Sequence, residues 1–188
     1  MTLRSLAASA AIAVFSLAGL TLSAASGEAP SAQPAPFQVA AAQGAAPNFT
    51  GLGNWFNSAP INIADLRGKV VLVNFWTYGC VNCVNTLPHV TALYEKYKDR
   101  GLVVVGVHTP EFPFERSASN VQAALKRHGI SYSVAQDNDS QTWNAYRNQY
   151  WPAQYIVDQS GKIVFQHDGE GQYEQIDRTI ARLLNASS

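Results

Sequence analysis

The chemistry of this chain is concentrated in one short segment that holds both of its cysteines. Cys80 and Cys83 are separated by two residues, Val81 and Asn82. A thiolate with a second thiol three residues further along can attack a disulfide, and the second thiol can then resolve the mixed disulfide. The spacing therefore favours a thiol–disulfide redox centre.

Three other uses of a cysteine pair compete with redox chemistry. A structural disulfide is possible in an exported protein, but a bridge that closes so short a loop constrains the unfolded chain little. A closed zinc site needs four ligands, and Cys80, Cys83 and the nearby His89 leave it one ligand short. A haem-attachment motif requires a histidine directly after the second cysteine, where this chain has Val84. The redox interpretation is preferred, with the structural and metal-binding alternatives left open.

The residues on either side of the cysteines predict a strand followed by a helix. Residues 70–76 form an apolar run rich in β-branched and aromatic side chains, which is typical of a buried strand. Apolar residues then recur every three or four positions, as on one face of a helix, at Cys83, Leu87, Val90, Tyr94 and Tyr97. Cys80 is thereby expected at or near the first turn of the helix, where peptide N–H groups and the helix dipole favour a thiolate.

The rest of the chain alternates predicted strands and helices and ends in a hairpin and a helix. Strands are expected at 102–107, 132–135, 153–157 and 162–166, with an irregular strand or hairpin at 55–63. Helices are expected from the cysteines to about residue 100, then at 121–128, 140–148 and 173–183. This order predicts an α/β domain with a mixed sheet that is covered by helices on both faces.

The N-terminal residues predict export. Residues 1–25 have the pattern of a signal peptide or signal anchor, with Arg4 before an apolar stretch at 6–22 and small residues at 23–25. Residues 26–47 are rich in Ala, Gln and Pro and are expected to form a flexible linker. Export places the cysteines outside the reducing cytosol, so a periplasmic or other extracytoplasmic location is expected. Contact with the membrane is expected only if the N-terminal segment stays uncleaved.

Residues 48–188 provide enough chain for one domain with its own core. The whole sequence contains 13 Lys plus Arg and 13 Asp plus Glu, which gives a formal net charge of zero. It therefore lacks the basic patterning expected of a nucleic-acid-binding protein. Partner choice is expected to rest on shape and local contacts rather than on long-range electrostatic steering.

Several stretches carry a family resemblance. Residues 66–76 lead into the cysteine pair, and Pro88 lies five residues after Cys83, as does the proline that kinks the active-site helix of thioredoxins. Residues 151–164 match the segment that carries the cis-proline, and residues 108–136 match a central insertion. The chain thus resembles the thioredoxin-fold family. It is most similar to the exported TlpA/ResA-like thiol–disulfide oxidoreductases and to the thioredoxin-like domain of DipZ-type proteins.

The resemblance implies roles for particular residues. Cys80 would be the attacking thiol and Cys83 the resolving one, and Pro152 would be cis and would face them. The groove for the substrate chain would include Tyr78, Trp151 and Ala153.

The proton carrier is expected to differ from that of thioredoxin. Where thioredoxin carries an aspartate before the cysteines, this chain has Asn74, which cannot titrate. The resemblance implies a glutamate from the central insertion instead, and Glu111 stands in about that place. The apolar residues around it are expected to suit it to hold a proton near neutral pH. His108 lies at the end of a predicted strand and has no assigned role.

The resemblance implies disulfide exchange that needs no cofactor, with protein disulfides or dithiols as substrates. It favours a reductive role, as in cytochrome c maturation or metal-site assembly, with electrons from a membrane carrier of the CcdA/DsbD kind. A peroxiredoxin-like peroxidase is an alternative, because Thr77 and Cys80 supply the TxxC half of its signature, but Val73 stands where the other half has a proline four residues before the threonine. A non-catalytic module that binds a metal or a partner is the second alternative.

Overall fold

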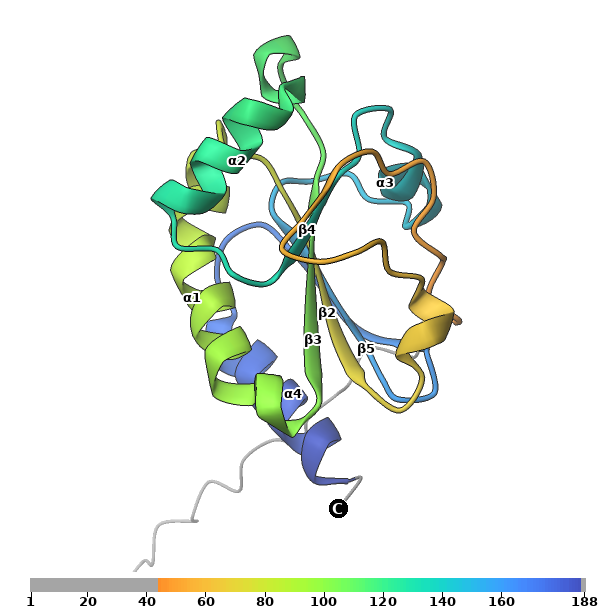
Figure 1. Cartoon of the computed structure of the whole chain (residues 1–188). Coiled ribbons are helices and arrows are strands. Elements are labelled where there is room, and N and C mark those ends of the chain that lie inside the picture. The colour runs from red at the N-terminus through yellow and green to blue at the C-terminus, as the bar shows by residue number, and fades with distance from the viewer. Residues whose placement is uncertain (1–43, 187–188) are drawn as a thin grey trace, which may run out of the picture. The chain divides into compact units, whose positions relative to one another are not determined.

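The computed structural model describes residues 44–186, so the expected signal peptide and most of the expected linker lie outside the described residues. A six-stranded mixed sheet forms the centre of the domain, in the order β1-β4-β3-β2-β5-β6 (Figure 1). The strands are β1 (Trp55–Phe56), β2 (Val70–Trp76), β3 (Leu102–His108), β4 (Ser133–Gln136), β5 (Ala153–Val157) and β6 (Ile163–Asp168). The neighbours β2, β3 and β4 run parallel, whereas β1, β5 and β6 are antiparallel to their neighbours.

Helices cover both faces of this sheet, which confirms the predicted fold class. The α-helices are α1 (Val81–Tyr97), α2 (Ala118–Arg127), α3 (Gln141–Ala145) and α4 (Tyr173–Asn185). Short 3-10 turns are η1 (Ile63–Leu66), η2 (Lys98–Arg100) and η3 (Pro113–Arg116). Figure 1 shows α1, α2 and α4 on one face and α3 on the other. Among the described residues, no helix is long and apolar enough to cross a membrane.

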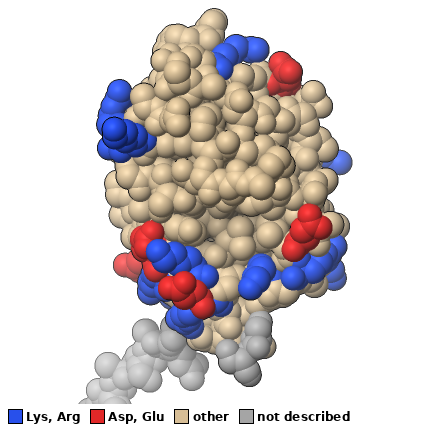
Figure 2. All heavy atoms as spheres, in the orientation of Figure 1, with Lys and Arg blue, Asp and Glu red and all other residues tan. Residues whose placement is uncertain are grey.

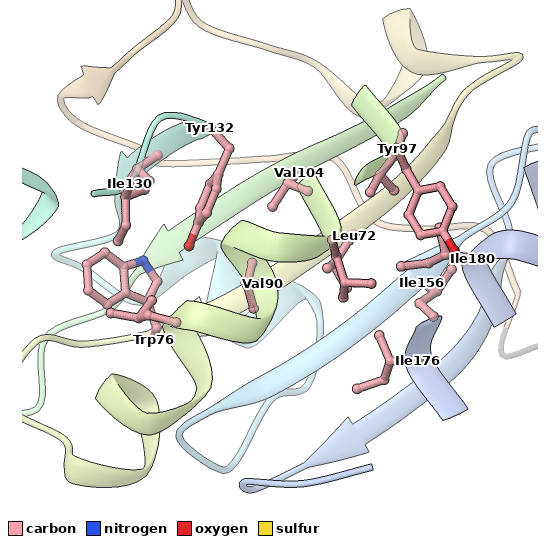
Figure 3. Packing of buried hydrophobic residues seen from close by; sticks show 14 of the residues in the cluster. Leu72, Trp76, Val90, Tyr97, Val104, Ile130, Tyr132, Ile156, Ile176 and Ile180 are labelled. Atoms are coloured by element: carbon pink, nitrogen blue, oxygen red, sulfur yellow. The ribbon is translucent and has the colours of Figure 1, made fainter. Parts of the chain in front are cut away.

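Strand β2 is buried along its whole length and supplies both layers of the core. Its side chains alternate between the two faces of the sheet, so Leu72 and Trp76 enter one cluster while Val73 and Phe75 enter the other. Figure 3 shows the first of these clusters, in which Leu72 and Trp76 share the core with Val90 of α1. Because both faces of the sheet are buried at this strand, its sequence is an almost unbroken apolar run.

Two features of the fold go beyond the sequence expectations. The N–H of Ala46 donates to the carbonyl of Gly161 over 2.9 Å, and Ala45 bridges Lys162, so the ordered domain begins before residue 48. Turn η3, inside the central insertion, was also not predicted. It stands at the upper end of the domain in Figure 1 and brings a carboxylate to the cysteines.

Candidate active site

The two cysteines lie at the start of α1, just beyond the end of β2. Cys80 is the N-cap residue of α1, and its Sγ accepts the N–H of Cys83 at 3.3 Å. Both cysteines are free thiols. Cys80 is partly exposed, whereas Cys83 is completely buried. A partner can therefore reach only the first sulfur directly, which is the arrangement that an attacking and a resolving thiol require.

Burial sets the protonation state of the second thiol. Desolvation raises the pKa of the Cys83 thiol well above its ordinary value, and the hydrogen bond with Cys80 raises it further. A hydrogen bond with the backbone of Thr77 partly offsets this increase in pKa. Cys83 is therefore held as a neutral thiol at pH 7, and it must lose its proton before it can attack Cys80.

The loop before β5 faces the exposed thiol. The Trp151–Pro152 peptide bond is cis, as the sequence predicted, and the Cys80 thiol points at the Trp151 carbonyl oxygen over 3.9 Å. The Trp151 ring is held in place on both sides, because its Nε1 donates to Thr109 O at 3.0 Å and it packs against Trp143. This loop therefore forms a fixed wall beside Cys80.

A shallow hollow lies next to this wall. It has a volume of about 360 Å³ and is lined by Asn82, Tyr150, Trp151, Asp168 and Gly169. Trp151 therefore lines a surface hollow beside the start of α1.

The structure places the other two expected groove residues differently. Tyr78 is half-buried, and its hydroxyl donates to the Phe114 carbonyl at 2.9 Å, so it supports the insertion. The expectation for Ala153 was wrong. Ala153 is completely buried in β5, where it pairs with Phe75, because the alternation of the strand turns its side chain into the core.

The carboxylate beside the cysteines comes from Glu115 and not from Glu111. Glu111 is exposed, so the expected apolar surroundings of its side chain are absent. Glu115 is completely buried and accepts three backbone hydrogen bonds. Its Oε1 accepts from Gly79 at 2.9 Å, and its Oε2 accepts from Glu111 at 2.6 Å and from Phe112 at 2.9 Å. The carboxylate thus joins the insertion to the residue that precedes Cys80.

The approach of Glu115 is so close that residue 79 must lack a side chain. A Cβ on Gly79 would overlap Glu115 Oε1. The sequence does contain a signal for this arrangement. Pro113 is suited to the first position of a helical turn, and a glutamate three residues after the N-cap residue Phe112 can reach back to the N-cap N–H.

His108 is a second buried polar group at the site. Its Nε2 lies 3.3 Å from Thr77 Oγ1, and its ring stacks on Tyr78 with centroids 5.5 Å apart. Burial lowers the pKa of His108 to about 4, although the nearby negative charge of Glu115 acts in the opposite direction. His108 is therefore a neutral packing residue at pH 7, and it supports the segment that leads to Cys80.

Replacing His108 with glutamine is expected to reduce the sensitivity of the fold to acid. The unfolded chain takes up a proton on His108 near pH 6.5 and the folded protein only near pH 4, so this residue's stabilising contribution is complete above pH 6.5 and is lost as the pH falls towards 4. The difference in unfolding free energy between pH 7.5 and pH 4 should be about 3 kcal/mol smaller in His108→Gln. Urea unfolding of both proteins at both pH values measures this difference, and an unchanged difference would show that His108 protonates as easily in the folded state.

The donor set does not favour a metal at this site. Across residues 44–186, no group of three or more His, Cys, Asp or Glu side chains is placed to hold a metal ion. What the site does provide is a reachable thiol, a shielded thiol and a fixed loop beside them. Together with the mixed sheet, these features define a thioredoxin-like protein of the thiol–disulfide oxidoreductase class.

Comparisons with known proteins agree with this class. The AhpC/TSA family model matches residues 42–166, which is more than half of the chain, and the chain belongs to that family. A thioredoxin-like protein solved in its oxidised form superposes with a TM-score of 0.70 at 27% identity, over 77% of this chain and 97% of that one.

Two relatives are similar in sequence to most of this chain. Protein DipZ of Mycobacterium tuberculosis is 46% identical over 145 residues, which is 76% of this chain but 21% of DipZ. This chain therefore spans only about a fifth of DipZ. The thiol–disulfide oxidoreductase YkuV of Bacillus subtilis is 29% identical over 73% of this chain and 93% of YkuV.

Proposed function

We propose that this protein is an extracytoplasmic thiol–disulfide oxidoreductase that uses Cys80 and Cys83 to reduce disulfides in protein substrates. The observation that carries the proposal is the contrast between the two thiols. Cys80 is reachable and faces the loop of Pro152, whereas Cys83 is buried behind it. Such a pair can form a mixed disulfide with a partner and then release it.

The reaction proceeds in two exchange steps. The Cys80 thiolate attacks one sulfur of the substrate disulfide, a new S–S bond forms, and the other substrate sulfur leaves as a thiolate that takes up a proton. Cys83 then loses its proton and attacks the Cys80 sulfur, which releases the second substrate thiol. Two electrons and two protons have passed to the substrate, and the protein is left with a Cys80–Cys83 disulfide.

The cycle needs an external dithiol to reduce that disulfide. We infer that a membrane carrier of the CcdA/DsbD kind supplies the electrons, since the N-terminal pattern predicts export to a compartment without a cytosolic thiol pool. The TlpA/ResA-like pattern of the sequence supports a reductive role, such as cytochrome c maturation or metal-site assembly.

The reduction of insulin disulfides at pH 7 tests this proposal, with the Cys80→Ser variant as the inactive control. The unmodified protein, supplied with dithiothreitol, should precipitate the insulin B chain at least tenfold faster than dithiothreitol alone. A parallel assay with hydrogen peroxide distinguishes the peroxidase alternative. Rapid consumption of peroxide without insulin reduction would overturn the proposal. Equilibration with glutathione then gives the reduction potential and hence the direction of electron flow.

A further inference from the structure

The large hydrophobic side chains that the domain leaves exposed are gathered around the cysteines. In the described part of the chain these side chains are Val81, Phe112, Phe114 and Tyr150, with exposed fractions of 72%, 46%, 58% and 56%. We call these four residues the apolar docking face. Neither the core nor the exchange chemistry accounts for their exposure, and exposed apolar groups that cluster mark interaction sites.

Sequence and contacts place three of these residues near Cys80. Val81 directly follows it in sequence. Phe114 is tilted against the Tyr78 ring with centroids 6.2 Å apart and lies close to Gly79, and it stacks with Phe112 at 5.6 Å.

Tyr150 completes the face from the other side of the cysteines. It precedes Trp151 and lines the hollow beside the start of α1. The face thus comes from two elements near the exposed thiol, with the phenylalanines on the insertion and the tyrosine on the cis-proline loop.

The phenylalanine pair is held in place by the protein itself. Glu115 Oε2 accepts the N–H of Phe112, and the Phe114 carbonyl accepts from the Tyr78 hydroxyl and from Asn120 Nδ2. Little ordering is therefore required when a partner covers these rings, and an interface preorganised in this way binds more tightly.

The shape of the site favours an extended segment over a flat folded surface. Turn η3 projects from the upper end of the domain in Figure 1 and carries Phe114, while Tyr150 is exposed on the other loop. A substrate sulfur must approach the partly exposed Cys80 close to these exposed rings. Figure 2 shows charged side chains mainly at the lower end of the view, although basic and acidic side chains also lie at its upper end. Because the four exposed side chains of the apolar docking face are hydrophobic, the complementary partner is apolar next to its cysteine.

We propose that the apolar docking face binds an extended polypeptide segment that carries an aromatic or large aliphatic side chain beside its cysteine. This inference rests on the proposed function, and it specifies the class of substrate. Phe112 and Phe114 determine specificity by covering that side chain, and they take no part in the exchange of electrons. On this inference, a folded domain with a flat surface around its disulfide is the poorer substrate.

Single-turnover reduction of two peptides by the prereduced protein tests the inference. Each peptide carries one cysteine as a mixed disulfide with 2-mercaptoethanol, flanked by phenylalanine in one and by serine in the other. The unmodified protein should reduce the phenylalanine peptide about tenfold faster, since tenfold corresponds to the partial burial of one aromatic ring. The variant Phe112→Ser/Phe114→Ser should lose this preference and still reduce 2-hydroxyethyl disulfide at the parental rate.

The exposed residue Gln122 on α2 provides the matched control, because Gln122→Ser should keep both the preference and the rate. Thermal unfolding of each variant verifies that the fold is intact. A phenylalanine preference that survives in the double variant would overturn the proposal that Phe112 and Phe114 bind the substrate. Equal rates with a folded protein disulfide and the phenylalanine peptide would overturn the proposal that the bound segment is extended. If the parent protein fails even with 2-hydroxyethyl disulfide, the proposed function itself is wrong, and this inference falls with it.

Discussion

Cys83→Ser is expected to accumulate stable mixed disulfides between Cys80 and its substrates. Cys80 is the thiol that a partner can reach, and without the second thiol the intermediate has no intramolecular route to resolution. Turnover in the insulin assay should fall by at least 100-fold, because only slow attack by external thiols remains. Non-reducing gels and mass spectrometry of the trapped species measure the effect.

Cys80→Ser is the matched variant, and it should trap nothing because Cys83 is completely buried. Equal trapping by the two variants would contradict the assignment of the attacking thiol. The release of the trapped partner has its own pH dependence in the unmodified protein. Burial raises the pKa of Cys83, so resolution requires a proton loss that becomes easier as the pH rises. Rapid-quench measurements between pH 6 and pH 9 should therefore show resolution becoming faster with increasing pH.

Glu115→Gln is expected to destabilise the protein and change the titration of its thiols, whereas Glu111→Gln should do neither. A glutamine keeps the size of the side chain, but its NH₂ group cannot accept a hydrogen bond, so at least one N–H among Gly79, Glu111 and Phe112 loses its acceptor. A buried donor left without an acceptor costs about 1–3 kcal/mol of stability.

The thiol titration separates an electrostatic role of Glu115 from a purely structural one. The negative charge of Glu115 helps to raise the pKa of Cys83, so its removal should lower that pKa. Urea unfolding and the pH dependence of alkylation measure the two effects, and Glu111→Gln should match the parent within about 0.5 kcal/mol. A larger effect from Glu111→Gln than from Glu115→Gln would restore the original expectation for the insertion.

The sequence predicted the parts of this protein that repeat a simple pattern. The apolar run at residues 70–76 and the spacing from Cys83 to Tyr97 give β2 and α1 directly, because burial of one strand and one helix face imposes those periods. The cis bond before Pro152 was predicted from the resemblance and is present.

The error over the two glutamates has a physical cause. Glu111 and Glu115 lie four residues apart in a loop with two prolines, and no hydrophobic period specifies which of them turns inward. The short turn η3 directs Glu115 inward, and the hydrogen bond from the Gly79 N–H to Glu115 is a tertiary contact that no local pattern predicts. For Ala153 the sequence did contain the needed information. The predicted strand at 153–157 pairs with β2, and the alternation of side chains along that strand directs Ala153 to the core.

The Glu115 carboxylate also connects the segment before Cys80 with the apolar docking face. One of its oxygens holds Gly79 next to Cys80, and the other holds Phe112 in the apolar docking face. Coupling between two sites is reciprocal, so a partner that prefers the reduced form tenfold raises the potential by about 30 mV for this two-electron couple. The same dithiol can thus be a stronger reductant when free than when a partner of this kind is bound.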